Sequence, residues 1–139
     1  MLHYKLLHPQ ILSTLGSAGH GSQILIADSN YPFSTGAYPD AERVYLNLAP
    51  GLLTLTDVLQ VVTSAVPIES AKAIHPLEGE DPPIFAEYGK LLPDIEITKT
   101  GRFPFYEAAR SHNTALVIAT GEQRIWACIL LTIGVVLPG

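Results

Sequence analysis

A histidine and an aspartate flank a short apolar run near the start of the chain. His20 lies between two glycines, and Asp28 follows the run Ile24 to Ala27. Imidazole gains or loses a proton near neutral pH, which suits acid–base chemistry. The glycines allow a tight turn and the close approach of a ligand. The run itself is short enough for a strand buried on both faces. We therefore predict that both polar groups are directed at one functional site.

The spacing of His20 and Asp28 limits how they can share a ligand. They are eight positions apart, which corresponds to about 26 Å in an extended chain that rises about 3.3 Å per residue. One small molecule contacts both only if the glycine loop folds back or if a second copy of the chain supplies one of them. We expect the second arrangement. The hydrophobic content of 47% also favours self-association, because obligate interfaces resemble a domain core.

The segment from Arg102 to Arg110 carries two further candidates. Arg102 stands at a predicted helix start, where its charge opposes the helix dipole. This placement predicts an anionic or hydroxyl-rich partner, although a plain surface cation is the alternative. Tyr106 belongs to an aromatic group with Phe103 and Phe105, which either packs or lines a site.

The late segment Glu122 to Leu130 carries the remaining candidates. Trp126 and Cys128 alternate with Leu130, as residues on one face of a strand do, so they belong either to the core or to a pocket wall. Glu122 either serves the site or has a structural role, in which it pairs with Arg124 or caps a turn. The other histidines show no metal-ligand spacing and are expected in surface or packing positions: His3, His8, His75 and His112.

Composition excludes several classes of protein. The formal net charge is −5 without a basic cluster, so we expect no nucleic-acid partner. The single Cys128 excludes an intrachain disulfide framework and a cysteine-based zinc site. No secretory signal pattern is present, and the apolar stretch Ile125 to Leu137 is too short and interrupted to span a bilayer. We expect a soluble, cytoplasmic protein. Without a Walker loop, GxGxxG, HExxH or nucleophile elbow, it is expected to use no cofactor and no metal.

Helical and strand patterns alternate along the chain. Helices are predicted from His8-Pro9-Gln10 to the glycines 16 and 19, from Thr54 or Thr56 to about Ala65, from Asp81-Pro82-Pro83 through Leu92, and over Arg102 to Arg110. Strands are predicted at Gln23 to Asp28, Glu42 to Leu48, Ile68 to Ile74, Ile95 to Thr98, Ala115 to Ala119 and Ile129 to Val136. The alternation predicts one α/β domain over residues 1–139, a three-layer α/β/α arrangement with a mainly parallel or mixed central sheet. The loop Ser29 to Asp40 is long for a simple connection, and loops of this length in compact domains are often functional.

Four motifs in order resemble the D-ribose pyranase and L-fucose mutarotase family, nearer the fucose branch. They are Gly19-His20-Gly21, Ile26-Ala27-Asp28, Arg102-Phe103-Pro104-Phe105-Tyr106-Glu107, and Ala119-Thr120-Gly121-Glu122 before an apolar strand. The resemblance implies interconversion of sugar anomers or ring forms without a cofactor. It also implies decamers of stacked pentameric rings with active sites near subunit boundaries.

The resemblance also implies roles for individual residues. His20 would be the catalytic acid/base, Tyr106 would assist it, and Asp28 and Arg102 would bind the sugar. Mutarotation opens a hemiacetal and closes it on the other face, so the ring oxygen gains a proton while the anomeric hydroxyl loses one. General acid–base assistance of this kind contributes about 10²- to 10⁴-fold.

One part of the pattern departs from the family. After Thr-Gly-Glu the family carries Tyr-x-Asn, and this chain has Trp126 and Cys128 at those positions. An indole stacks on a sugar face and donates one hydrogen bond but accepts none. Cysteine lacks the paired donor and acceptor of an amide. Two rival interpretations therefore stay open: a sugar-binding or sensing oligomer without catalysis, and a purely structural oligomer.

Overall fold

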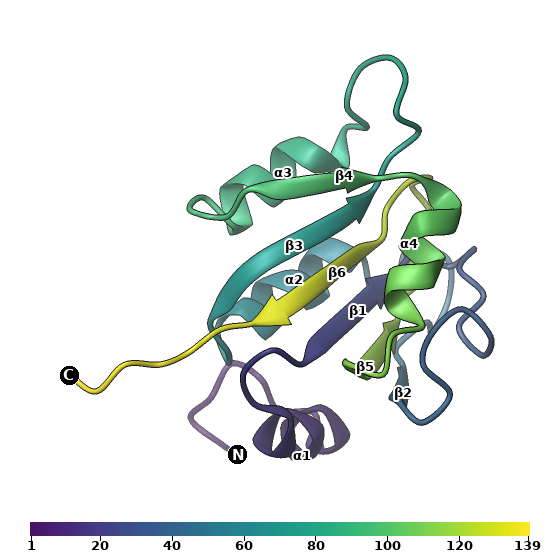
Figure 1. Cartoon of the computed structure of the whole chain (residues 1–139). Coiled ribbons are helices and arrows are strands. Elements are labelled where there is room, and N and C mark those ends of the chain that lie inside the picture. The colour runs from purple at the N-terminus through teal and green to yellow at the C-terminus, as the bar shows by residue number, and fades with distance from the viewer.

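A computed structural model describes all residues from Met1 to Gly139. Its centre is a six-stranded sheet with the strand order β2-β5-β1-β6-β3-β4 (Figure 1). The strands are β1 (Gln23–Ala27), β2 (Glu42–Tyr45), β3 (Ile68–Ile74), β4 (Ile97–Thr100), β5 (Thr114–Ala119) and β6 (Ile129–Ile133). Only β6 runs opposite to the others, since it is antiparallel to both β1 and β3. The sheet is therefore mixed, one of the two predicted forms.

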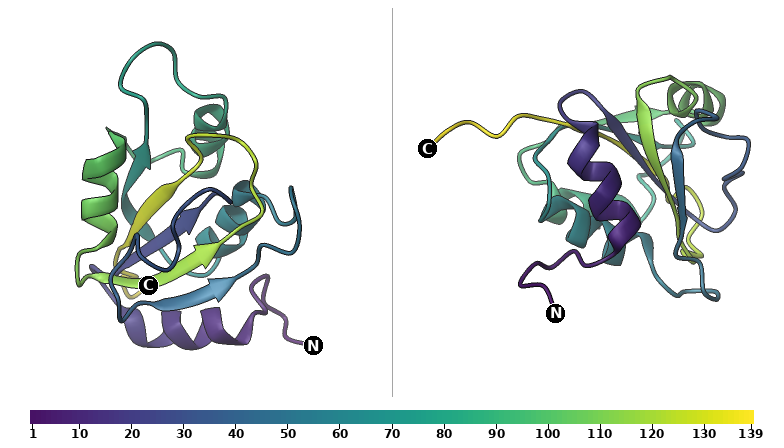
Figure 2. Two further views of the ribbon diagram at one scale, coloured as in Figure 1. Left: turned by 90° about the vertical axis from the view of Figure 1, so that its right-hand side faces the viewer. Right: turned by 90° about the horizontal axis from the view of Figure 1, so that it is seen from below.

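Four helices cover the two faces of this sheet. They are α1 (Pro9–Ala18), α2 (Leu55–Thr63), α3 (Ile84–Leu91) and α4 (Arg102–Ala109). The first three pack on one face, and α4 packs on the other together with the loop after β1 (Figures 1 and 2). The predicted three-layer α/β arrangement is confirmed. None of the helices, at 8 to 10 residues, is long and apolar enough to cross a membrane.

Strand β1 contributes to the core on both faces of the sheet, because successive side chains of a strand point to opposite faces. Ile24 and Ile26 join the cluster under α1 to α3, whereas Leu25 and Ala27 join the cluster under α4. All four are fully buried. The short apolar run thus forms the two-sided buried strand that its composition predicts.

Local signals account for the helix starts. Pro9 occupies the first turn of α1, and the His8 side chain accepts a hydrogen bond from the Ile11 N–H. Thr54, rather than Thr56, caps α2 through a reciprocal capping box with Asp57. Gly16 does not end α1, which continues to Ala18 before Gly19 turns the chain.

Several strand boundaries differ from prediction. β2 ends at Tyr45 and β4 spans Ile97–Thr100, two residues later than expected. β6 ends at Ile133, and the apolar residues beyond it extend away from the sheet without pairing (Figure 1). A β-pattern in sequence marks residues that suit a strand, whereas the ends are set by where the neighbouring strand stops.

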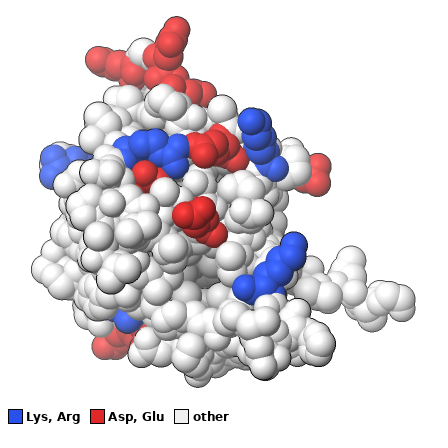
Figure 3. Space-filling view, turned by 180° about the vertical axis from the view of Figure 1, so that it is seen from behind, with Lys and Arg blue, Asp and Glu red and all other residues white.

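Charged side chains are dispersed on the face that carries α2 and α3. Figure 3 shows basic groups there as separate patches among uncharged atoms. Acidic groups gather at the tip of the loop between β3 and α3, whose exposed residues include Glu78, Glu80 and Asp81. This face presents no continuous basic surface of the kind that binds nucleic acid.

Candidate functional site

The topology brings polar loops together at one edge of the sheet. The parallel strands end at the edge where β6 begins, and ligands of open α/β sheets commonly bind outside the carboxyl ends of strands. A pocket of about 260 Å³ lies at this edge. It is lined by Asp28, Asn30, Tyr31, Ile74, Arg102, Tyr106, Ile125, Trp126 and Cys128. Five of the six predicted site residues therefore share one pocket, and His20 is the exception.

Asp28 is the buried carboxylate of this pocket, with 6% of its surface exposed. Its Oδ1 accepts the Asn30 N–H at 3.0 Å, and its Oδ2 accepts the Ala127 N–H at 3.4 Å. Burial raises the pKa of Asp28 above its ordinary value, and these hydrogen bonds offset only part of that effect. The carboxylate is fixed in place by the two segments that flank it, which suits it to accept hydrogen bonds from a bound molecule.

Cys128 packs directly against the start of the Asp28 loop. Its Sγ accepts the Asp28 N–H at 3.5 Å, and the residue is buried. Burial raises the pKa of this thiol well above its ordinary value, with Asp28 adding to the effect. A buried neutral thiol is a poor nucleophile, so Cys128 contributes a small apolar surface to the pocket.

Trp126 lies in a turn and not on a strand, which corrects the predicted alternation with Cys128. β6 begins only at Ile129, and Trp126 has φ 58°, in the left-handed region. This conformation turns the chain before β6 and places the indole at the pocket, half-buried. Trp126 and Cys128 therefore both line the pocket, but a turn places Trp126 there and not the alternation of side chains along a strand.

Helix α4 supplies the opposite wall. Arg102 Nε donates to the Tyr106 hydroxyl at 3.3 Å, and the guanidinium also lies 5.6 Å from the centre of that ring. The Tyr106 ring meets Tyr31 edge-on at 5.0 Å. Arg102 is exposed and forms no salt bridge, so its remaining donors face solvent at the pocket mouth.

His20 lies at the other end of β1. Gly19 (φ 78°) and Gly21 (φ 86°) adopt left-handed conformations that only glycine adopts without strain. The His20 Nε2 lies 2.9 Å from Glu69 Oε1, and both side chains are about half exposed. Within one chain the glycine loop does not fold back, so His20 and Asp28 do not meet.

Glu122 is buried and paired with Arg124, one of the two alternatives considered for it. Its Oε1 accepts Arg124 Nη2 at 2.7 Å and the Leu55 N–H at 3.3 Å, at the first turn of α2. Although burial alone raises the pKa of Glu122, the Arg124 guanidinium and the backbone N–H groups of Arg124 and Leu55 hold that pKa below its ordinary value. Glu122 therefore supports the site from behind and does not line it.

His75 has a more specific setting than its sequence indicates. It is buried at the end of β3, and its Nε2 lies 2.9 Å from Asp81 Oδ1. The Leu77 N–H donates to Nδ1 at 2.8 Å, so Nε2 is the ring nitrogen that donates to Asp81. Lys99, followed by His75, holds the pKa of Asp81 below its ordinary value. The position of His75 directly after an apolar strand was the available signal.

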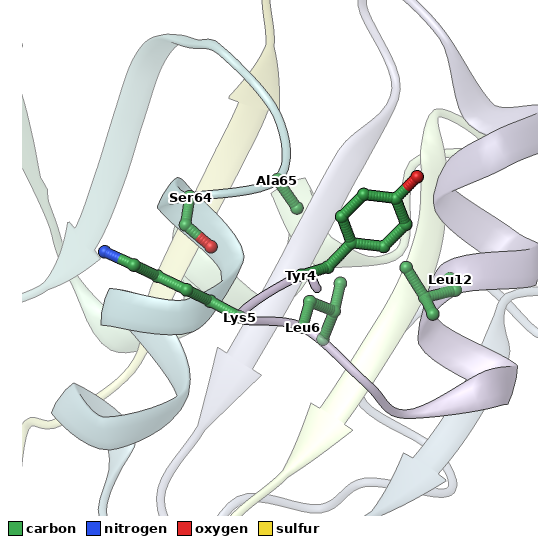
Figure 4. A pocket seen from close by; sticks show the side chains of 6 residues that line it. All are labelled: Tyr4, Lys5, Leu6, Leu12, Ser64 and Ala65. Atoms are coloured by element: carbon green, nitrogen blue, oxygen red, sulfur yellow. The ribbon is translucent and has the colours of Figure 1, made fainter. Parts of the chain in front are cut away.

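A larger hollow, of about 490 Å³, lies between the N-terminal segment and helices α1 and α2. It is lined by Tyr4, Lys5, Leu6, Leu12, Ser64 and Ala65 (Figure 4). No carboxylate or imidazole enters it, and the Lys5 ammonium points away from Tyr4 and Leu12. Elsewhere, no group of three His, Cys, Asp or Glu side chains is arranged to hold a metal ion. Of these two hollows, the pocket at the carboxyl ends of the strands is the one in which polar groups converge.

Curated relatives resemble the chain over almost its whole length. A fucose mutarotase of Mus musculus is 32% identical, over 94% of this chain and 90% of the relative. A D-ribose pyranase of Chloroflexus aggregans is 28% identical, over 94% and 95% of the two chains. Fucose mutarotases and D-ribose pyranases are isomerase-type enzymes.

Solved structures share the fold. The fucose mutarotase of Streptococcus pneumoniae, in complex with L-fucose, aligns with a TM-score of 0.84 and 26% identity, covering 99% of this chain and all of the other. RbsD of Bacillus subtilis, complexed with D-ribose, has the same fold, with a TM-score of 0.85 at 24% identity and the same coverage. The family model described as the RbsD / FucU transport protein family matches residues 1–136. The chain therefore belongs to the RbsD / FucU family, as the motifs around His20, Asp28, Arg102 and Gly121 predict.

Proposed function

We propose that this protein is a cofactor-free monosaccharide mutarotase in which His20 moves the protons and the Asp28 pocket holds the sugar. The observation that carries the proposal is the pocket itself. It combines a fixed, buried carboxylate with a guanidinium, a phenol and an indole in a volume suited to one sugar ring. Carboxylates and guanidinium groups bind hydroxyls, and aromatic faces pack on the C–H surface of a sugar.

The contact between His20 and Glu69 suits proton transfer. A carboxylate at 2.9 Å from Nε2 accepts its N–H, which leaves Nδ1 with a free lone pair. In that tautomer Nδ1 is the base that removes the anomeric proton, and Glu69 stabilises the imidazolium that results. Returning the proton to the ring oxygen opens the hemiacetal, and the reverse sequence closes it on either face. Tyr106, at the pocket, is suited to pass a proton on the other side of the sugar.

We infer further that each working site is built from two chains. Asp28 follows β1 at the end of the sheet that holds the pocket, whereas His20 precedes β1 at the opposite end. A closed ring of identical chains repeats one contact and brings unlike surfaces together. Such a ring, pentameric or stacked as a decamer, would place the His20 edge of one copy at the Asp28 pocket of the next. Two exposed apolar side chains favour a covering neighbour: Ile125, which lines the pocket, and Phe103, which contacts the pocket residues Arg102 and Tyr106.

The substrate class we propose is an aldose such as L-fucose or D-ribose, and the setting is the cytoplasm. The named relatives act on these sugars. Exchange between the anomers of fucose and exchange between ring forms of ribose use the same proton transfers, so the pocket chemistry supports both.

The test is saturation transfer by NMR between anomeric protons, over a panel of L-fucose, D-ribose, D-galactose and L-rhamnose. We expect protein-dependent exchange with at least one sugar, which disappears in His20→Ala while binding is retained. A matched control is His112→Ala, which removes an exposed imidazole remote from the pocket.

A sugar-binding protein without catalysis is the rival, and Trp126 and Cys128 motivate it. It predicts a sugar-dependent rise in melting temperature with exchange no faster than in buffer. A purely structural oligomer predicts neither effect. Either result, with folded protein, would contradict the proposal.

A further inference from the structure

The turn that carries Trp126 is held by a side chain instead of by backbone pairing. Residues 123–126 take part in no backbone–backbone hydrogen bond. The segments on both sides are tied down: Ser29 donates twice to the Glu122 carbonyl, and the Ala127 N–H donates to Asp28. The four residues between these two points include Ile125 and Trp126 of the pocket wall. Side-chain contacts must hold them in place, because no backbone hydrogen bond does.

Arg124 supplies an anchor of this kind. Its Nη2 donates to Glu122 Oε1 at 2.7 Å and to Thr56 Oγ1 at 3.4 Å, and its Nη1 donates to Glu87. Its backbone N–H also donates to Glu122 Oε2 at 3.2 Å. One guanidinium thus joins the turn to helix α2 through Thr56 and to helix α3 through Glu87. Glu122, which is almost fully buried, is neutralised by the same group.

The geometry at Trp126 gives this anchor a functional meaning. Trp126 holds φ 58°, a conformation that costs about 1–3 kcal/mol for a bulky residue and persists only where the surroundings impose it. Ile125 is largely exposed, whereas the Trp126 indole packs against the cluster under α4. The polar contacts that constrain the turn come from Arg124 on one side and Ala127 on the other. Loss of the Arg124 contacts would leave the indole free to leave the pocket wall.

We propose that Arg124 is a positioning residue for the sugar site. Its guanidinium, which donates to both Glu122 and Glu87, fixes the 123–126 turn and thereby places Trp126 against the bound sugar. The assignment of the ligand rests on the proposed function, whereas the anchoring of the turn does not. Arg124 acts through Trp126 and does not itself line the pocket.

The chain offers a direct probe, because Trp126 is the only tryptophan. Its emission and its quenching by acrylamide report on this turn alone. In Arg124→Lys the ammonium is a single point that cannot reproduce the planar fork between two carboxylates. Glu87→Gln weakens only the outer half of the anchor. Lys90→Gln is the matched control, since it removes a charge from the same helix without touching the turn.

In Arg124→Lys we expect stronger quenching, red-shifted emission and a sugar KM raised about tenfold, with kcat within about twofold of wild type. Glu87→Gln is expected to show smaller shifts in the same direction, and Lys90→Gln none. Far-UV circular dichroism verifies that each variant is folded. Because Glu87 is a partly exposed side chain, its variant remains informative if Arg124→Lys does not fold.

Unchanged quenching and emission in folded Arg124→Lys and Glu87→Gln would overturn the anchoring. Altered quenching with unchanged sugar affinity would overturn the link to the sugar. If wild type turns over no sugar, the proposed function fails, yet the fluorescence measurements still decide whether Arg124 holds the turn.

Discussion

His20 precedes β1 and Asp28 follows it, so the strand between them keeps the two side chains apart. Glu69 accompanies His20 at one edge of the sheet, and Trp126 accompanies Asp28 at the other. A chemistry that needs both groups is then a property of two chains in contact. This relationship gives the first prediction.

Mixing two inactive variants is expected to restore activity. His20→Ala lacks the proposed base, and Asp28→Asn lacks the proposed carboxylate. After random subunit exchange, about one quarter of the sites formed between neighbours carry both native groups. Native Asp28 comes from a His20→Ala chain and native His20 from an Asp28→Asn chain, each with a probability of one half. Anomeric exchange measured by NMR should recover to about that fraction. A mixture as inactive as its components, despite demonstrated subunit exchange, would contradict a site shared between neighbouring chains.

Replacement of Glu69 should weaken proton transfer without weakening sugar binding. Glu69→Gln keeps the shape but removes the charge that stabilises the imidazolium. We expect kcat to fall about tenfold, with KM little changed, because such an interaction is made mainly in the transition state. The rate is followed by saturation transfer at several pH values, beside Glu78→Gln as an exposed control. Equal falls in both variants would contradict the assignment.

Asp28 should lower the stability of the protein at neutral pH. Burial raises its pKa in the folded state, so the folded chain binds the proton more tightly than the unfolded chain. The stability that this protonation provides is present below the ordinary carboxyl pKa and is lost as pH rises through the raised folded value. Asp28→Asn does not titrate, so its melting temperature relative to wild type should increase from acidic to neutral pH. Asp94→Asn, at an exposed position, is the control. A difference that stays constant with pH would contradict the prediction.

A pair of glycine substitutions should have opposite effects. A Cβ added at Gly121 would lie 2.4 Å from the carbonyl oxygens of Ala49 and Leu52, which are backbone atoms that cannot move aside cheaply. Gly121→Ala is therefore expected to lose about 1–3 kcal/mol. A Cβ at Gly16, inside α1, meets nothing within 4 Å, so Gly16→Ala should gain about 0.5–1 kcal/mol. Urea denaturation of both variants measures the two changes.

Local features of the fold were predictable, because short-range signals determine them. The apolar run of β1, the capping by Thr54 and the prolines before α3 each identify an element from a few neighbouring residues. The antiparallel direction of β6 was not, because it depends on which strands lie beside it. The same limit explains the early ends of β2 and β6.

The candidate site divides in the same way. His20, Asp28 and Tyr106 carry chemistry that their residue types and motifs indicate. The side chains that contact the site residues could not be identified from the sequence, because they lie far away along the chain. Glu69 is 49 residues from His20, and Glu87 is 37 residues from Arg124. Trp126 was predicted at the pocket but on a strand, because residue alternation gives no sign of a left-handed turn. Only the tertiary arrangement defines such contacts.

The hydrogen bond from the Asp28 N–H to Cys128 Sγ joins residues 100 positions apart. β1 likewise completes its pairing only with β5 and β6, which come late in the chain. During synthesis, an emerging chain therefore exposes the apolar surface of β1 until residues beyond 128 have left the ribosome, a period in which chaperones are most needed. Its pairings are of high contact order, so folding is expected to be slow. A nascent chain becomes able to bind a ligand at this pocket only after Cys128 and β6 have emerged.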